Sequence, residues 1–267
     1  MKLILRNMVV VVLTVVVFGC VTNTGGSANN STDKAEKGID WVEVAPEYHA
    51  GTIEVYRAAT DQLDDRLKKM ESAITEVVSE VDSQVDSNEK KPAIILDVDE
   101  TILSNLVVQK EFASVGYKPE LWDEWVNKAE APALAGSVEF LQLAAKQGVM
   151  IFYVTNRDVS LEAATRKNLA RFGFPISESV DTVLLQNEKP GWTSDKASRR
   201  IYVAKDYQVI MLFGDDLNDF ISAKQLSKKE RDEAVVKYKG YWGERWFLLA
   251  NPMYGSWVKL IGGEDYN

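Results

Sequence analysis

The chain has 267 residues, of which 46% are hydrophobic and 27% charged, a composition typical of one globular domain and not of a disordered chain. Its 40 acidic residues outnumber 31 basic ones, and the net charge of -9 argues against a nucleic-acid polymer as partner, because such binding needs clustered cations. The single histidine, His49, and the single cysteine, Cys20, exclude Ser-His-Asp triads, Cys-His pairs, histidine nucleophiles and intrachain disulfides, which leaves carboxylates as the catalytic side chains.

The amino terminus has the pattern of a targeting signal. Lys2 and Arg6 precede an apolar run that ends at Phe18, too short to span a bilayer with ease but long enough for a signal-peptide core. The run leads into Cys20 and resembles the lipobox of bacterial lipoproteins, except that Phe18 stands where a smaller residue is usual. We expect residues 1–20 to be a lipoprotein signal peptide, with Cys20 lipidated and anchoring the chain to a membrane. An ordinary signal peptide with an incidental cysteine is the alternative.

Residues 21–40 are rich in Gly, Asn, Ser and Thr, which predicts a flexible tether before a folded domain over 41–267. The residue after the cysteine is Val21 and not aspartate, which by the same resemblance suggests the outer membrane of a Gram-negative cell envelope. From 46 to about 81, apolar residues recur at intervals of three and four and predict a packing helix.

Short continuous apolar runs follow and predict buried parallel strands at 93–96, 149–154, 182–185 and 208–213. Helical patterns lie between them, at 135–147, 160–172 and 195–205. This alternation predicts an α/β fold with a doubly wound parallel sheet. The stretch 105–132 interrupts the alternation after the first strand, and we expect it to form a small helical cap.

Polar clusters end three of the predicted strands. The first strand runs into Asp97 and Asp99, the second into Thr155 and Asn156, and the fourth into Gly-Asp-Asp-Leu-Asn-Asp at 214–219. One such cluster alone could merely cap the next helix. Because ligands of open parallel sheets bind outside the carboxyl ends of the strands, the three clusters together indicate one site.

These clusters resemble three of the four motifs of the haloacid-dehalogenase superfamily, and within it those of the class C acid phosphatases, lipoproteins that include surface 5′-nucleotidases. The fourth motif is a lysine. Lys196 is preferred to Lys189 for this position, because it opens a predicted helix with Ser and Asp capping signals. The likeness runs from about 41 to 258.

The resemblance implies a division of labour in phosphoryl transfer. Asp97 would be the nucleophile that forms an aspartyl-phosphate, and Asp99 the general acid and base. Thr155, Asn156 and Lys196 would hold the phosphoryl oxygens.

The resemblance also implies Mg²⁺ as cofactor. The carboxylates of Asp97 and Asp215 and the backbone carbonyl of Asp99 would bind it, since this cation prefers oxygen ligands. Asp219, in preference to Asp216, would support these ligands from outside.

Substrate recognition rests on the same likeness. Tyr48 and Tyr254 would hold a nucleobase between their rings, with ordinary packing as the alternative, and such stacking contributes ~1–3 kcal/mol per base. Val108 departs from the family signature, which has a tyrosine there. Trp122 and Trp125 are three residues apart in the predicted cap, where we expect them to be buried.

The sequence therefore predicts a Mg²⁺-dependent acid phosphatase for small phosphomonoesters, with nucleoside 5′-monophosphates as the expected substrates. The alternatives are a broad sugar-phosphate phosphatase and a catalytically silent surface-binding lipoprotein; the presence of all four motifs argues against the latter. His49 is expected to be structural or to line a pocket. The family resemblance alone suggests a homodimer.

Overall fold

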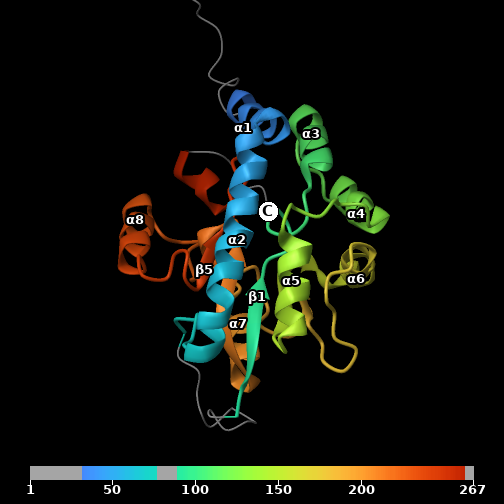
Figure 1. Ribbon diagram of the computed structural model, residues 1–267. Helices are drawn as coiled ribbons and strands as arrows, with labels where there is room; N and C mark the ends of the chain where they lie inside the picture. The colour runs from blue at the N-terminus through green and yellow to red at the C-terminus, as the bar shows by residue number, and fades with distance from the viewer. Residues whose placement is uncertain (1–31, 77–88, 262–267) are drawn as a thin grey trace, which may run out of the picture.

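The computed structural model describes residues 32–76 and 89–261 (Figure 1). The predicted signal peptide with Cys20, and residues 21–31 of the predicted tether, lie outside these ranges. Within them, no helix combines the length and the apolar character needed to cross a membrane.

A sheet of five parallel strands forms the centre of the described structure, in the order β3-β2-β1-β4-β5. The strands are β1 (Lys91–Leu96), β2 (Met150–Asp158), β3 (Val183–Gln186), β4 (Tyr207–Gly214) and β5 (Trp246–Leu248). The predicted doubly wound sheet is confirmed, because β1 lies in the middle and the chain winds outward on both sides of it. The sequence did not indicate β5, which pairs in parallel with β4 through Leu212 and Trp246.

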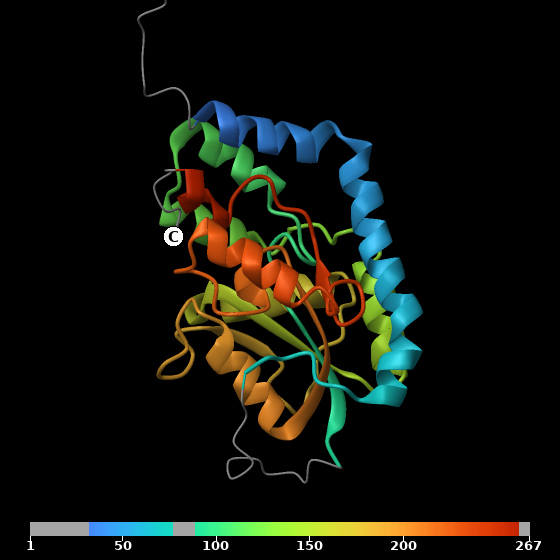
Figure 2. The same cartoon turned by 90° about the vertical axis from the view of Figure 1, so that its left-hand side faces the viewer.

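Helices cover both faces of the sheet (Figures 1 and 2). They are α1 (Thr32–Val44), α2 (Pro46–Lys69), α3 (Leu106–Val115), α4 (Pro119–Lys128), α5 (Ser137–Lys146), α6 (Glu162–Arg171), α7 (Ala197–Asp206) and α8 (Lys228–Lys237), with 3-10 turns at Val159–Leu161, Leu217–Asp219 and Ser256–Ile261. Alternate residues of β1 point to opposite faces of the sheet and pack in different core clusters. Ile94 and Leu96 pack in the core cluster with α2, α5 and α6, whereas Ala93 and Ile95 pack in the cluster with α7.

The helix predicted over 46–81 is shorter than expected. It ends at Lys69, and Met70 takes the left-handed conformation (φ 50) that commonly closes a helix. Ala73 then donates its backbone N–H to the carbonyl of Val209 at 2.8 Å, and Ile74 is buried without being helical. The apolar pattern therefore continues beyond the helix, while the predicted positions from 77 to 81 lie outside the described residues.

The prediction of a flexible tether as far as residue 40 was wrong from Thr32 onward, where helix α1 begins. Ile39 and Val42, three residues apart, are buried against Tyr48, Leu134 and Met253. The apolar contacts of this short stripe hold the helix to the domain.

The stretch expected to form a cap holds α3 and α4. Both lie with α1 toward the carboxyl ends of the strands (Figures 1 and 2). Pro119 suits the first turn of α4, because its missing N–H has no partner there in any case. These helices form one wall of the cavity described below.

Candidate active site

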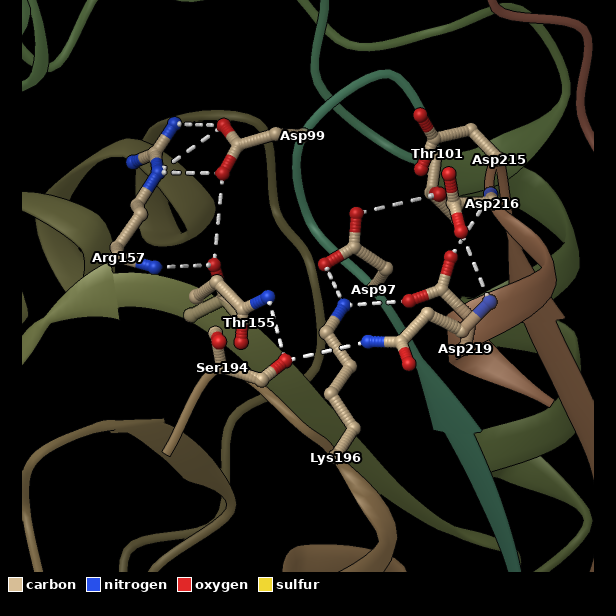
Figure 3. Close-up of polar contacts among 12 residues, drawn as sticks. Asp97, Asp99, Thr101, Thr155, Arg157, Ser194, Lys196, Asp215, Asp216 and Asp219 are labelled. Atoms are coloured by element: carbon tan, nitrogen blue, oxygen red, sulfur yellow. Dashed lines mark hydrogen bonds and ion pairs between the residues drawn. The ribbon is translucent and has the colours of Figure 1, made fainter. Parts of the chain in front are cut away.

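Three carboxylates meet where β1 and β4 end (Figure 3). Asp97 follows β1, Asp215 follows β4, and Asp219 ends the 3-10 turn after β4. One carboxylate oxygen of each lies within 4.8 Å of the other two. This set of oxygen donors suits a hard divalent cation.

Lys196 lies in the same cluster. Its Nζ donates to the carboxylate of Asp97 and, at 2.6 Å, to Oδ1 of Asp219, and the residue is only 5% exposed. Burial alone would lower the pKa of Lys196, but Asp219 and Asp97 reverse the direction and raise it. Lys189, the rival in the sequence, lies with its Nζ 4.7 Å from the ring centroid of Trp192 instead.

Two carboxyl groups of the cluster, those of Asp97 and Asp215, hold their protons more tightly than usual. Burial raises the pKa of Asp97 to about 7, more than the Lys196 ammonium lowers it, because Asp219 and Asp99 add negative charge nearby. Burial also raises the pKa of Asp215 well above its ordinary value of 3.8, and Asp219 and Asp97 add to the effect. The negative charge exceeds what one ammonium balances, so the cluster fits a bound cation.

Asp99 does not join this cluster. Its carboxylate turns toward Arg157, whose Nη2 donates to Oδ1 at 2.8 Å and whose Nε donates to both oxygens at 3.1 and 3.2 Å (Figure 3). The hydroxyl of Thr155 donates to the same carboxylate at 3.4 Å. The sequence analysis gave Arg157 no role, although the residue directly follows Thr155 and Asn156.

The carboxyl end of β2 is fixed by a buried arginine that the sequence did not indicate. Arg199 donates from Nη2 to Oδ1 of Asn156 at 2.7 Å and to the carbonyl of Thr193 at 2.8 Å, and from Nη1 to the carbonyl of Thr155. Its position three residues after Lys196, on the same helix, was the available signal. Arg199 thus holds the predicted phosphate-binding groups against the start of α7.

A cavity of about 660 Å³ opens over these groups. It combines polar residues from the strand ends with an aromatic wall, and its lining includes Asp97, Asp99, Asn156, Arg157, Lys196, Asp215, Asp219, Phe112, Tyr117, Trp122 and Tyr254. Thr155 is fully buried and is not among the lining side chains. Tyr254, which was predicted to hold a nucleobase, is among the lining residues.

The structure does not bring Tyr48 into this cavity. Tyr48 is 4% exposed, packs edge-on against Trp41 with ring centroids 5.8 Å apart, and lines a neighbouring cavity between α2 and α8. His49 is exposed and contacts the ring of Tyr48. In the structure the ring of Tyr48 packs against its neighbours, as the alternative prediction for this residue had it.

The two cap tryptophans differ. Trp125 is buried as expected, and its Nε1 donates to Oδ1 of Asn105 at 2.8 Å. The expectation of burial was wrong for Trp122, which is half-buried and lines the cavity.

Known proteins share sequence and fold with this chain. The sequence model of the HAD superfamily, subfamily IIIB (acid phosphatase), matches residues 22–257. The crystal structure of the class C acid phosphatase from Bacillus anthracis with tungstate bound is similar, with a TM-score of 0.74 and 35% identity over 89% of this chain and 92% of that one. The stem 28 kDa glycoprotein of Glycine max is 26% identical over 61% of this chain and 60% of its own length. Acid phosphatase 1 of Solanum lycopersicum is 28% identical over 60% and 57%. The match thus spans less than two thirds of the length of these plant relatives.

Proposed function

The chain belongs to subfamily IIIB, the acid phosphatases, of the haloacid-dehalogenase (HAD) superfamily, and from this membership we propose that it is a Mg²⁺-dependent phosphomonoesterase with an aspartyl-phosphate intermediate. The position of Asp97 carries the proposal. This carboxylate accepts a hydrogen bond from Lys196, lies within reach of Asp215 and Asp219, and lines the cavity. It is therefore a buried nucleophile with a cation and a candidate metal site beside it.

In the proposed reaction an oxygen of Asp97 bonds to phosphorus while the ester P–O bond breaks. Asp99 gives its proton to the departing oxygen, so that the product leaves as an alcohol. Water then attacks the phosphorus and passes a proton to Asp99, which releases inorganic phosphate and returns Asp97 as a carboxylate. The ammonium of Lys196 and the amide of Asn156 offer N–H donors to the phosphoryl oxygens.

We propose that Mg²⁺ binds the carboxylates of Asp97 and Asp215 and the backbone carbonyl of Asp99. One carboxylate oxygen of Asp219 also lies within 4.8 Å of one oxygen of each of these two carboxylates, so Asp219 belongs to the same candidate metal centre. Asn251 donates to Oδ2 of Asp215 at 2.7 Å, which fixes this carboxylate from outside the cluster. A cation held there would offset the repulsion between an anionic nucleophile and an anionic substrate.

Nucleoside 5′-monophosphates are the substrates we propose. Phe112, Tyr117, Trp122 and Tyr254 line the same cavity as Asp97, and aromatic rings of this kind stack on nucleobases. Val108, the departure from the family signature, is 2% exposed in the core and does not line the cavity, so it removes no cavity contact. Tungstate in the Bacillus anthracis structure is an oxyanion, as phosphate is, which supports oxyanion binding in this fold.

A lipid anchor at Cys20 and a place in the bacterial cell envelope, at the outer membrane, complete the proposal. Their support is the sequence of residues 1–21 alone. Membrane fractionation of cells that express the wild type or Cys20→Ser tests the anchor. If Cys20 carries the lipid, the wild type stays in the membrane fraction and the variant does not. A homodimer stays a prediction.

Hydrolysis of an aryl phosphate and of a mononucleotide panel, with and without Mg²⁺, tests the main proposal. We expect wild-type activity to require the metal, and Asp97→Asn to lower kcat at least about 10³-fold, because the nucleophile of the covalent step is lost. Asp61→Asn, an exposed position on α2, is the matched control and should keep full activity. Activity in Asp97→Asn that equals the wild type would reject the mechanism, and a flat rate across the panel would reject the nucleotide preference.

A further inference from the structure

The two aspartates that follow β1, Asp97 and Asp99, form ion pairs with different buried cations. Lys196 forms ion pairs with Asp97 and Asp219, whereas Arg157 is paired with Asp99. Asp97 and Asp99 are only two residues apart, yet their carboxylates face different partners (Figure 3). The separation therefore depends on where the two cations are held.

The guanidinium of Arg157 is fixed on several sides. Its side chain has no exposed surface, and beside the forked contact with Asp99 its Nη1 donates to the hydroxyl of Thr165 on α6 at 3.2 Å. The ring of Trp122, on α4, lies 5.7 Å from the guanidinium carbon. A planar guanidinium held in this way can direct a carboxylate in both position and orientation.

Asp99 receives a further donor from the start of the cap. Nδ2 of Asn105 donates to its Oδ1 at 2.8 Å, and Asn105 is itself held by Trp125. Asp99, Arg157 and Trp122 all line the cavity over Asp97. The carboxylate of Asp99 therefore faces the side of the cavity that the cap helices form.

We propose that Arg157 is the positioning residue for Asp99, and that it keeps this carboxylate on the cap side of the cavity, where the leaving group of the substrate lies. The inference rests on the proposed function. Lys196, the other buried cation of this site, already pairs with Asp97 and Asp219, so the guanidinium fork of Arg157 gives the carboxylate of Asp99 a partner of its own.

The proposal assigns no proton and no bond to Arg157 itself. When the ester P–O bond breaks, its electron pair goes to the departing oxygen, and that oxygen takes the proton from Asp99. An alkoxide needs this proton to leave, whereas an acidic phenolate leaves without it. The contribution of Arg157 should therefore depend on the basicity of the leaving group.

The test is kcat/KM, with Mg²⁺ supplied, for phosphomonoesters whose leaving groups range from 2,4-dinitrophenol to a simple alkyl alcohol. We expect Arg157→Met to lose less than about 3-fold on the dinitrophenyl ester but about 10²-fold or more on the alkyl ester. Arg157→Lys, which keeps the charge without the fork, should lie between the wild type and Arg157→Met on the alkyl ester.

Further variants separate a positioning role of Arg157 from an effect of its loss on folding. Asp99→Asn should show the same selective loss, and the pair Asp99→Asn with Arg157→Met should lose no more than Asp99→Asn alone, because both act on one proton transfer. The double variant carries no unpaired charge at this place, so it remains informative if Arg157→Met unfolds. Arg66→Met removes another buried, ion-paired arginine, at the carboxyl end of α2, and should leave every kcat/KM unchanged.

An equal loss on all esters, or no loss on any, would overturn the positioning role of Arg157. So would an added loss in the double variant. Failure of the proposed function gives a different result, in which the wild type hydrolyses none of the esters or Asp97→Asn hydrolyses them as well as the wild type does.

Discussion

Glu100 carries a buried carboxyl group that the proposed chemistry does not use. The residue is fully buried in the left-handed conformation (φ 57), and the backbone N–H of Asn105 donates to its two oxygens at 3.0 and 3.1 Å. Burial raises the pKa of Glu100 from 4.5 to about 8; the charge of Asp99 adds to this rise, and Asn105 and Tyr254 oppose it. The folded protein therefore keeps this proton where the unfolded chain has lost it.

The proton on Glu100 links stability to pH. The protonated carboxyl of Glu100 contributes fully to stability below pH 4.5, the pKa of the unfolded chain. This contribution is lost as the pH rises through 8, the pKa in the folded state, because the folded protein must then bury a charge. We predict that Glu100→Gln, which mimics the protonated carboxyl, removes this loss. Relative to the wild type, the variant should gain up to ~1.4 kcal/mol of unfolding free energy per pH unit between 5 and 8.

Urea unfolding at a series of pH values measures this difference. Glu111→Gln, an exposed position on α3, is the control and should keep the wild-type dependence. If Glu100→Gln also keeps the wild-type slope, Glu100 does not hold its proton in the folded state.

The sequence could bring Asp97 and Lys196 to one site, because Asp97 follows a recognisable buried strand and Lys196 opens a recognisable helix. The contacts of Arg157 and Arg199 could not be predicted, since they depend on which distant group each one meets: Asp99 after β1 for Arg157, and Asn156 at the end of β2 for Arg199. The place of Tyr48 could not be predicted for a similar reason. The sequence pattern of a tyrosine on a helix face is the same whether its ring packs on α1 or lines the cavity over Asp97.

At the scale of elements, the end of β4 must let the following turn fold back on it. A Cβ added at Gly214 would lie 2.2 Å from both Cβ and Oδ2 of Asp219, a distance that no side chain tolerates. Oδ2 of Asp219 also accepts from the backbone N–H of Asp216 at 3.0 Å. The close approach of strand and turn thus sets the place of one carboxylate in the cluster.

We predict that Gly214→Ala displaces Asp219 and lowers kcat/KM about 10²-fold, because a small misplacement of a carboxylate in the proposed metal centre is costly. Overpacking of this kind should also lower the unfolding free energy by ~1–3 kcal/mol. Steady-state kinetics with urea unfolding measures both effects.

Gly51→Ala is the control for this substitution. Gly51 lies within α2 with nothing within 4 Å of an added Cβ, so alanine there should stabilise the protein by ~0.5–1 kcal/mol and leave activity unchanged. Full activity in Gly214→Ala would show that Asp219 can move without consequence.

Element type followed from the sequence more reliably than element ends. Buried runs identified β1 to β4, because strands covered on both faces are apolar throughout. β5 is three residues long and leaves Leu248 half exposed at the sheet edge, so it has no such run. The end of α2 was missed because apolar residues continue past Lys69 into a buried segment that is not helical.

At the scale of the whole molecule, the protein carries a net charge of -9 and gathers several of its acids at one sheet edge. Asp97 has its pKa raised by burial from 3.8 to about 7, so its contribution to stability is full below pH 3.8 and is lost as the pH rises through 7. Asp215 has the same direction of shift. The metal-free protein should therefore weaken toward alkaline pH.

A cation at the cluster would reverse that weakening, which gives the last prediction. Mg²⁺ should raise the thermal midpoint more at pH 8 than at pH 5, because protons compete with the metal for the same carboxylates. At a hundredfold excess over the dissociation constant, the gain is ~2.7 kcal/mol. Asp215→Asn should remove most of this gain, measured by thermal unfolding with chelator and with Mg²⁺.

The neighbouring Asp216→Asn is the matched control for charge. Asp216 bonds Ser256 and caps the turn after β4 but lies outside the carboxylate cluster, so its variant should be less stable yet keep the wild-type response to Mg²⁺. An equal response in Asp215→Asn and the wild type would mean that the metal binds elsewhere. A response that falls as the pH rises would mean that the cluster is not where protons and Mg²⁺ compete, since removing those protons can only strengthen binding there.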